Sequence, residues 1–318
     1  MENRTALVTG SAGYLGSILS KQLKSQGWRV IGFDIKSPSH RYYDVFHQGD
    51  ICDYDDLYLA FKLEKIDTVF HLAGRIEVGE SMKHPTTFWK VNVGGTSNLL
   101  DLMKRFKTEK IVFSSTAAVY WASNGPIPED ECIVNNSVYG NTKRACEIMI
   151  EDSGLKHVIF RYFNLSGAEG ELGENHEPET HLIPNIFKNL NNFTIFGDSY
   201  KTEDGTCVRD YVHVCDVADA HISGAEYLES GNRSIILNLG TGKGHSILEL
   251  INLIEKELGI EVNYHFGKKR SGDPDSLVAD VSLAEKVLNY RPKHDILSIL
   301  KSAYEWYKKD DRTESSRN

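Results

Sequence analysis

A tyrosine and a lysine four residues apart, Tyr139 and Lys143, are the residues of the chain best suited to proton transfer. Residues four apart lie on the same face of a helix, so the ammonium group would lie beside the phenol. A free tyrosine has a pKa of about 10, and a neighbouring cation lowers it by stabilising the phenolate. Such a pair can take a proton from a hydroxyl group and return it. Taken alone, the spacing also fits an exposed Tyr–Lys pair on a helix surface.

A threonine, Thr116, closes the run Ser114-Ser115-Thr116 at the end of a predicted strand. Its hydroxyl could orient a substrate hydroxyl toward Tyr139. The carbon that carries this hydroxyl could then pass hydride to a nicotinamide ring, whose positive charge also favours phenolate. We therefore predict that Thr116, Tyr139 and Lys143 are the catalytic residues of an NAD-dependent enzyme.

A glycine-rich turn follows the first predicted strand, with glycines at Gly10, Gly13 and Gly16. Glycines let the backbone turn tightly and let a pyrophosphate approach the N-terminus of the next helix, where free N–H groups favour anions. A glycine triplet is weak evidence by itself, but here it lies between a strand and a helix. Asp34 ends the second predicted strand, where a carboxylate accepts hydrogen bonds from ribose hydroxyls and repels a 2′-phosphate. This pattern favours NAD over NADP.

The elements that must position these residues alternate between strand and helix. Strands are predicted at Thr5–Val8, Arg29–Phe33, Thr68–Leu72, Lys110–Ser114 and His157–Tyr162. Helices are predicted at Gly16–Gln26, Asp53–Lys62, Thr96–Phe106 and Asn141–Asp152. The alternation predicts an α/β fold with a doubly wound parallel sheet of the Rossmann type, whose ligands bind beyond the carboxyl ends of the strands.

The alternation breaks after Asn164. We therefore expect an NAD-binding Rossmann domain over residues 1–165, rejoined by about 210–240, and a smaller mixed α/β substrate lobe over most of 166–318. Within this lobe, Ser166–Glu179 lacks periodicity and is predicted to be a surface loop. The last helix is predicted over Ile296–Tyr307, with a charged, disordered tail from Lys308.

The composition of the 318 residues, 40% hydrophobic and 25% charged, is typical of globular proteins. A net charge of -9 argues against binding to nucleic acid or to a membrane surface. The five cysteines lack metal-ligand or redox spacing, and the sequence shows neither a signal peptide nor an apolar stretch of membrane-spanning length. These features predict a cytoplasmic protein with reduced thiols.

Several longer segments carry a family resemblance. They are Thr9–Ser17 (TGSAGYLGS), Val78–Ser81 (VGES), Asn92–Thr96 (NVGGT), Arg161–Asn164 (RYFN), Gly173–Pro184 (GENHEPETHLIP) and Asp204–His213 (DGTCVRDYVH). Over nearly its full length the chain resembles the UDP-glucose 4-epimerases of the extended short-chain dehydrogenase/reductase family. The last two segments are the most specific, since they belong to the part of the family that handles the sugar nucleotide.

The resemblance implies interconversion of UDP-glucose and UDP-galactose. Hydride passes from C4 of the hexose to bound NAD while Tyr139 takes the hydroxyl proton, the 4-keto sugar rotates, and both return to the other face. The resemblance also implies a UDP-hexose substrate, a tightly held NAD and a homodimer formed through the Thr96–Phe106 and Asn141–Asp152 helices.

Site residues are carried over from the family position by position. The cofactor set comprises Gly10, Gly13, Tyr14, Leu15, Gly16, Asp34, Asp50, Ile51, Leu72, Ala73, Gly74, Asn92, Ser114, Tyr139, Lys143, Tyr162 and Phe163. The substrate set comprises Thr116, Asn164, His181, Leu182, Phe196, Arg209, Arg270, Asp273 and Leu277. In these sets Asp34 takes the adenosine ribose, Asn164 and the arginines take the diphosphate, Phe196 takes the uracil and Asp273 takes the uridine ribose.

Some details separate this chain from related enzymes and leave alternatives open. Thr116 is followed by Ala117-Ala118, whereas sugar-nucleotide dehydratases carry a carboxyl group there to expel water, so elimination is disfavoured. Leucine at 277 is intermediate in size, and acceptance of N-acetylated UDP-hexoses or other UDP-sugars stays open. A dehydrogenase that releases NADH and a non-catalytic NAD sensor are weaker alternatives. Trp121 and Val138 depart from the family pattern near the nicotinamide side.

The run from His176 to His181 contains two histidines and two glutamates. The histidines are five residues apart with a proline between them, so they cannot share a helical face as a helical zinc motif requires. On this argument we expect no metal site.

Overall fold

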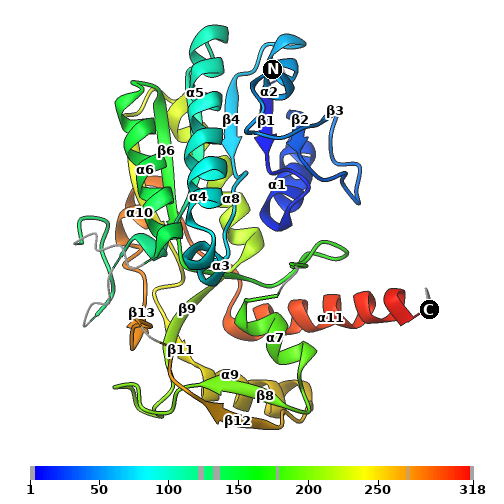
Figure 1. Cartoon of the computed structure of the whole chain (residues 1–318), viewed down its shortest axis with the longest axis vertical. Helices are drawn as coiled ribbons and strands as arrows, with labels where there is room; N and C mark the ends of the chain where they lie inside the picture. The colour runs from blue at the N-terminus through cyan, green and yellow to red at the C-terminus, as the bar shows by residue number, and fades with distance from the viewer. Residues whose placement is uncertain (1–3, 121–124, 132–136, 177–178, 271, 316–318) are drawn as a thin grey trace. The chain divides into compact units, whose positions relative to one another are not determined.

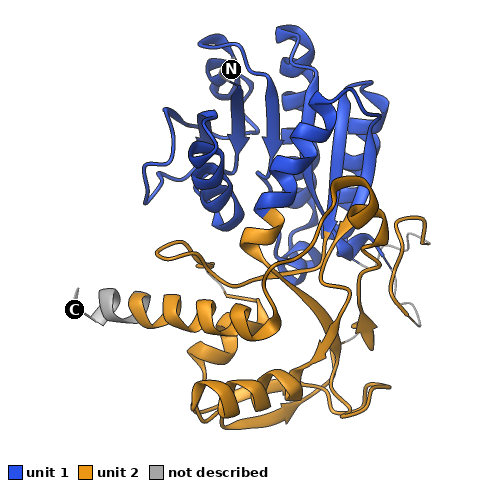
Figure 2. Ribbon diagram, turned by 180° about the vertical axis from the view of Figure 1, so that it is seen from behind, with its two compact units in different colours: residues 1–120, 132–161, 218–237 blue, residues 121–131, 162–217, 238–318 orange. Residues whose placement is uncertain are grey.

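The computed structural model of the chain describes residues 4–120, 125–131, 137–176, 179–270 and 272–315, with side chains described as far as 309. The chain divides into two compact units (Figure 2). Unit 1 comprises residues 1–120, 132–161 and 218–237, and unit 2 comprises residues 121–131, 162–217 and 238–318.

A seven-stranded sheet forms the centre of unit 1 (Figure 1). Its strands, in spatial order, are β3 (Val45–Gln48), β2 (Arg29–Asp34), β1 (Thr5–Thr9), β4 (Thr68–His71), β5 (Lys110–Thr116), β6 (Lys156–Tyr162) and β10 (Ile235–Leu239). The pairings from β3 to β5 are all parallel. The strand order reverses between β1 and β4, and this reversal is where doubly wound sheets bind their ligands. The predicted fold class is therefore confirmed.

Helices cover both faces of this sheet. One buried cluster joins Leu7, Val69 and Ile159 of the strands to α2 (Tyr54–Lys62), α5 (Gly95–Phe106) and α6 (Val138–Asp152). Side chains alternate across a strand, so Val158 and Phe160 face the opposite side. A methyl group on Gly224 of α8 (Val214–Glu229) would lie 3.0 Å from the Phe160 ring, which places α8 on that side. Helix α1 (Tyr14–Ser25) also packs against β1 and β2.

Several elements of unit 1 differ from the sequence prediction. Strand β3 was missed because Val45–Gln48 is a short, half-exposed edge strand in which only two residues are apolar. Helix α6 begins at Val138, three residues earlier than predicted, because the Ser137 hydroxyl accepts the Gly140 N–H at 3.0 Å and caps the helix there. A chain of short helices, α3 (Val78–Lys83), α4 (Pro85–Phe88) and the π-helical turn Trp89–Gly94, leads into α5.

Unit 2 contains two small sheets and its own core. Strand β9 (Val208–His213) pairs with β7 (Asn164–Ser166), β11 (Gly244–Ser246) and β13 (Ser276–Leu277), while β8 (Phe193–Phe196) pairs with β12 (Tyr264–Gly267). Its helices are α7 (Leu182–Lys188), α9 (Ile247–Leu253) with its π-helical extension Ile254–Leu258, α10 (Ser282–Leu288) and α11 (Ile296–Ser315). Residues of α7, α9 and α11 share one buried cluster.

The last helix is longer than predicted. Helix α11 runs from Ile296 to Ser315, beyond the predicted end at Tyr307. The helix is held in the core at Ile299 and Leu300, which are fully buried, and extension of an anchored helix costs little. Glu305 and Lys309 are also four residues apart in the favourable order for helix stability. In the described part of the chain, no helix combines the length and apolar character needed to cross a bilayer.

Candidate active site

The first turn of α6 holds the predicted proton-transfer residue in place. The Tyr139 N–H donates to the Ser81 hydroxyl at 3.1 Å, and the Thr142 hydroxyl donates to the Tyr139 carbonyl at 2.8 Å. Tyr139 and Lys143 are both buried on this helix, with 6% and 3% of their surfaces exposed. The interpretation as an exposed surface pair is therefore wrong.

The Lys143 ammonium group is shielded from water. Burial lowers the pKa of Lys143 to about 8. Its Nζ lies 4.6 Å from the centre of the Phe113 ring of β5, and no carboxylate among the described residues forms an ion pair with it. A buried ammonium is stabilised when oxygen atoms accept its hydrogens. The hydroxyl groups of a bound ribose would supply such oxygens, so the site suits a ligand that brings them.

Asn92 and Gly74 complete the surroundings of Lys143. The Asn92 amide accepts the Arg75 N–H at 2.8 Å and donates to the Thr142 hydroxyl at 2.9 Å, which ties α6 to the segment after β4. A methyl group on Gly74 would lie 3.0 Å from Asn92 Oδ1 and 3.8 Å from Lys143 Nζ. The structure therefore brings together three residues that were predicted to contact the cofactor.

Thr116 lies at the end of β5 and begins the short helical turn Ala117–Val119. Its hydroxyl accepts the Ala118 N–H at 3.1 Å, which fixes the threonine rotamer. The turn packs closely on α6, because a methyl group on Gly140 would lie 2.4 Å from the Ala118 carbonyl oxygen. Thr116 thus adjoins the helical turn that carries Tyr139, and alanine side chains occupy the positions where an eliminating enzyme needs carboxyl groups.

A buried ionic network lies one helical turn beyond Lys143, and sequence reasoning missed it. The fully buried Glu147 accepts hydrogen bonds from Arg161 Nε at 2.9 Å and Nη2 at 2.7 Å. Arg161 Nη1 also donates to the Tyr120 hydroxyl at 2.9 Å, and Ser115 donates to Glu147. The i+4 spacing from Lys143 to Glu147 was the available signal, since it places Glu147 on the same face of α6.

The glycine-rich turn lies where the strand order reverses, between β1 and β4. Gly10 has φ +72°, and a methyl group on it would lie 2.7 Å from the Ala73 nitrogen. A methyl group on Gly16 would lie 2.0 Å from the Gly10 carbonyl oxygen. Larger residues would push the turn, α1 and the Leu72–Gly74 segment apart. The close packing brings Gly10, Leu72 and Ala73 together at the predicted nucleotide end of the sheet.

Asp34 is held at the end of β2 with 8% of its surface exposed. Its two carboxylate oxygens accept the N–H groups of Ala12 and Lys36, both at 2.9 Å. Each oxygen has a second lone pair available for a ribose hydroxyl. Tyr43, which sequence reasoning missed, donates its hydroxyl to the Ser11 carbonyl at 2.8 Å and so braces the glycine turn.

A buried histidine of β4, His71, joins this strand to β1 and to α5. Its Nδ1 lies 2.8 Å from the Thr9 hydroxyl and its Nε2 lies 2.9 Å from the Thr96 hydroxyl. Burial, together with the positive charge of Lys143, lowers the pKa of His71 to about 3. The imidazole is therefore neutral and adds no charge beside Lys143.

Other predicted cofactor residues have structural contacts of their own. The Ser114 hydroxyl lies 2.9 Å from His221 Nε2. Ile51 is 6% exposed and packs under α5, where a methyl group on Gly95 would lie 2.7 Å from it. The Asp50 carboxylate accepts the Cys52 N–H at 2.9 Å. Tyr14, Leu15 and Gly13 lie at the start of α1. Val138 is the first residue of α6, and Trp121 lies outside the described residues.

Unit 2 gathers most of the predicted substrate residues around β9. The Arg209 guanidinium pairs with the Asp273 carboxylate at 2.8 Å, and Leu277 of β13 lies beside Arg209 in register. Tyr200, which sequence reasoning missed, donates its hydroxyl to Asp273 at 3.0 Å. These contacts hold Asp273 from two sides, with 28% of its side chain still exposed.

The remaining substrate residues lie on neighbouring elements of unit 2. The Arg270 guanidinium lies 4.4 Å from the centre of the Phe196 ring, at the end of β8. An exposed aromatic ring with a cation on one face can stack a base on the other. Asn164 of β7 pairs with Tyr211 of β9. Two predicted cofactor residues precede it: Tyr162 ends β6, and the Phe163 N–H donates to the Leu239 carbonyl at 3.0 Å.

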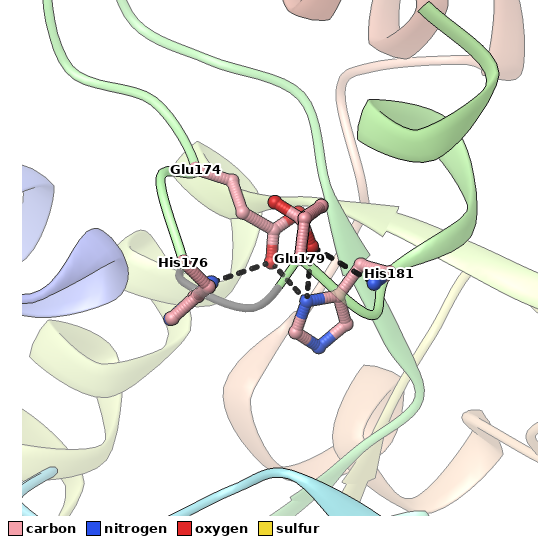
Figure 3. A group of neighbouring side chains, drawn as sticks. All are labelled: Glu174, His176, Glu179 and His181. Carbon is pink, nitrogen blue, oxygen red and sulfur yellow. Dashed lines mark hydrogen bonds and ion pairs between the residues drawn. The ribbon is translucent and has the colours of Figure 1, made fainter. Parts of the chain in front are cut away.

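Figure 3 shows His181 with its neighbours Glu174, His176 and Glu179. Its Nδ1 lies 2.7 Å from a Glu174 oxygen and 3.3 Å from a Glu179 oxygen. Burial opposes protonation of this imidazole, but the carboxylates of Glu174 and Glu179 outweigh it and raise the pKa of His181 to about 10. Leu182 begins α7 directly after it.

The chain is similar to known proteins over nearly its whole length. Residues 6–240 match the NAD dependent epimerase/dehydratase family. The UDP-glucose 4-epimerase of Lacticaseibacillus casei is 41% identical over 99% of this chain and 100% of its own length. The Brucella ovis UDP-glucose 4-epimerase, crystallised with NAD, superposes with a TM-score of 0.91 at 38% identity over 96% of this chain and 98% of its own.

A further solved structure adds a nucleotide ligand. The Bifidobacterium longum UDP-glucose 4-epimerase, crystallised with NAD+ and UDP, superposes with a TM-score of 0.90 at 33% identity, covering 96% of this chain and 99% of its own. The match to the family over residues 6–240 and the similarity over nearly the full length agree. The chain belongs to the NAD dependent epimerase/dehydratase family.

Proposed function

We propose that this protein interconverts UDP-glucose and UDP-galactose with NAD as its resident cofactor. The observation that carries the proposal is the buried pair Tyr139–Lys143 on α6, next to a Thr116 turn that contains alanines in place of carboxylates. This arrangement can move a proton but has no acid at the position that elimination of water requires. The similarity to UDP-glucose 4-epimerases over nearly the whole chain favours the same substrate.

NAD, when bound, supplies the acceptor and donor of hydride at the sugar carbon. Residues of the chain transfer the proton and position the sugar hydroxyl. Tyr139 takes the proton of the C4 hydroxyl as phenolate, and the positive charge of Lys143 lowers the cost of forming that phenolate. Thr116 orients the same hydroxyl. Because the product hydroxyl needs its proton back, Tyr139 returns it to the rotated 4-keto sugar, and no net oxidation occurs.

Most of the residues that would hold NAD lie in unit 1, and Tyr162 and Phe163 of the predicted set belong to unit 2. We propose that the Gly10–Gly16 turn receives the pyrophosphate, that Asp34 binds the adenosine ribose, and that Lys143 binds the nicotinamide ribose. Asp50 and Ile51 would line the adenine. The burial of the Lys143 ammonium supports its role in binding the ribose, because ribose hydroxyl groups would accept its hydrogens.

Unit 2 would hold the nucleotide part of the substrate. We propose that Phe196 and Arg270 hold the uracil and a phosphate, and that Asp273 binds the uridine ribose. Arg209 pairs with Asp273, so its contribution to phosphate binding would be shared with that carboxylate. Asn164, His181 and Leu182 complete the proposed set. Leu277 beside Arg209 would border the sugar and decide whether an N-acetyl group fits.

A homodimer in the cytoplasm is part of the proposal. Ile148 of α6 is 44% exposed on the helix that the family resemblance assigns to the interface. The cysteines of the described residues are all free, as a reducing compartment would keep them. Sedimentation equilibrium should give twice the chain mass, and Ile148→Glu should shift it toward the monomer. A wild-type monomer at micromolar concentration would contradict the dimer.

The test of function is simple. Purified protein is given UDP-galactose without added NAD, and UDP-glucose is measured by proton NMR. We expect conversion to an equilibrium mixture with no net NADH. No conversion by protein that holds one NAD per chain would contradict the proposal, and stoichiometric NADH would indicate a dehydrogenase. UDP-N-acetylgalactosamine in a parallel reaction tests the space beside Leu277.

A further inference from the structure

A loop in unit 2, between β7 and α7, gathers four side chains with metal-binding atoms. They are Glu174, His176, Glu179 and His181 (Figure 3), and one ligand atom from each lies within 4.8 Å of the others. The two histidines do not share a helix, as the proline between them predicts. Their ligand atoms lie close together without a shared helical face, so a helical zinc motif is not required for both to reach one ion.

The distances within the cluster are close to those of a coordination shell. His181 Nδ1 lies 2.7 Å from Glu174 Oε1 and 3.3 Å from Glu179 Oε1, and His176 Nδ1 lies 3.4 Å from Glu174 Oε1. Nitrogen and oxygen ligands at about 2.0–2.2 Å from a tetrahedral ion lie roughly 3.3–3.6 Å apart. Two of the three separations therefore match a shared ion, and the shortest needs to open slightly.

The cluster also contains buried polar atoms whose hydrogen-bonding capacity is unused. The Nδ1 atoms of both histidines and Glu179 Oε2 are shielded from solvent, and their contacts with the neighbouring carboxylates and with Lys188 Nζ, which lies 3.9 Å from Glu179 Oε2, have ion-pair distances without hydrogen-bond geometry. The Glu174 and Glu179 side chains are only 7% and 5% exposed. Two buried carboxylates that face two imidazole nitrogens need positive charge between them. Lys188 supplies part of it at Glu179, and a divalent cation or protons on the histidines can supply the rest.

The loop is anchored at both ends, which limits how far its ligands can move apart. Gly173 lies against Trp306 of α11, so closely that a methyl group on it would lie 2.4 Å from the indole ring. At the other end, the Asn185 amide of α7 donates to the carbonyl oxygens of Glu179 at 3.2 Å and His181 at 2.9 Å. Ligands held in this way lose little entropy on binding a metal.

We propose that Glu174, His176, Glu179 and His181 bind one divalent transition-metal ion, with Zn²⁺ as the best match. Mixed imidazole and carboxylate ligands suit Zn²⁺ better than Ca²⁺ or Mg²⁺, which prefer oxygen alone. Four protein ligands fill a tetrahedral shell, as in structural rather than catalytic zinc sites. The ion would fasten the loop to the start of α7, and the site is independent of the proton transfer at Tyr139.

The test uses the full-length protein after chelator treatment and removal of the chelator. Zn²⁺ alone is titrated in by calorimetry at pH 7.5, and the bound metal is counted by mass spectrometry. We expect one equivalent per chain and a higher melting temperature. X-ray absorption of the zinc-loaded protein should show a first shell of nitrogen and oxygen at about 2.0–2.1 Å.

Variants of two ligands and a matched control make the result specific. His176→Ala and Glu174→Gln should each weaken Zn²⁺ binding at least tenfold and abolish the rise in melting temperature. His245→Ala should leave both unchanged, because His245 and Glu249 form a similar ion pair at 2.7 Å outside the cluster. Circular dichroism of each variant checks the fold, and His176→Gln replaces any variant that fails to fold.

Two results would overturn the proposal. One is an absence of stoichiometric Zn²⁺ binding by the wild-type protein, which would leave a cluster neutralised by protonated histidines. The other is equal Zn²⁺ affinity in the wild type, His176→Ala and Glu174→Gln proteins, which would mean adventitious binding elsewhere on the surface.

Discussion

The buried pair of Glu147 and Arg161 gives the sharpest prediction about stability. Glu147 is fully buried and accepts two hydrogen bonds from Arg161, at 2.9 and 2.7 Å. Arg161→Met would keep the apolar length of the side chain and remove its charge. The Glu147 carboxylate would then be buried with only Ser115 and the partly exposed Arg144 to compensate it.

The expected cost follows from this loss of compensation. Removing one partner of a buried ion pair costs about 3–5 kcal/mol, and the remaining contact with Arg144 at 2.9 Å favours the lower end. Because the cost comes from an unpaired charge, adding Glu147→Met to Arg161→Met should recover most of it. Additive costs in the double variant would contradict this explanation.

Urea unfolding at pH 7, followed by circular dichroism and tryptophan fluorescence, measures these differences. The two signals must coincide, since a chain with two units can unfold in steps. Lys83→Met is the matched control, because Lys83 forms an exposed ion pair with Glu80 and such surface pairs contribute little to stability. A loss below about 1 kcal/mol in Arg161→Met would refute the reasoning.

Two further predictions concern His71 and Gly16, which lie at the proposed NAD-binding end of unit 1. His71 has a pKa of about 3 when folded and about 6.5 when unfolded, so its contribution to stability is present above pH 6.5 and declines as the pH falls toward 3. His71→Gln should flatten the pH dependence of the unfolding free energy between pH 6.5 and 4.5, by roughly 2–3 kcal/mol, and an unchanged slope would show that this imidazole does not titrate as described. Gly16→Ala should reduce NAD affinity at least tenfold in a fluorescence titration, because its methyl group would lie 2.0 Å from the Gly10 carbonyl oxygen. Gly79→Ala, whose methyl group would meet open space, should bind NAD normally, and equal affinities of the two variants would contradict the packing argument.

Sequence patterns predicted the regular elements of unit 1 well because those elements repeat simple periodicities. The buried strands such as Thr5–Thr9 are short apolar runs, and the helix that carries Tyr139 has a recognisable face. Edge strand β3 was missed because it is half exposed and too short to show alternation. The extension of α11 to Ser315 was missed because its anchoring depends on tertiary contacts.

In the candidate site too, contacts between residues close in the sequence could be predicted, whereas contacts between residues far apart could not. Tyr139 and Lys143 could be paired from their spacing, since a helix fixes the relation between them. The pairing of Arg209 with Asp273 joins residues 64 positions apart and depends on the register of β13 beside β9. The cluster around His181 was rejected on helical geometry, because the path of an irregular loop cannot be read from periodicity.

The central claim is that Tyr139 is the group that exchanges a proton with the sugar. The most direct measurement is the rate of UDP-galactose epimerisation by Tyr139→Phe, with its bound NAD quantified in the same sample. We predict NAD content equal to that of the wild type and a kcat lower by roughly 10²–10⁴-fold, the range expected for loss of a general base. A kcat within tenfold of the wild type, with NAD bound, would contradict the claim.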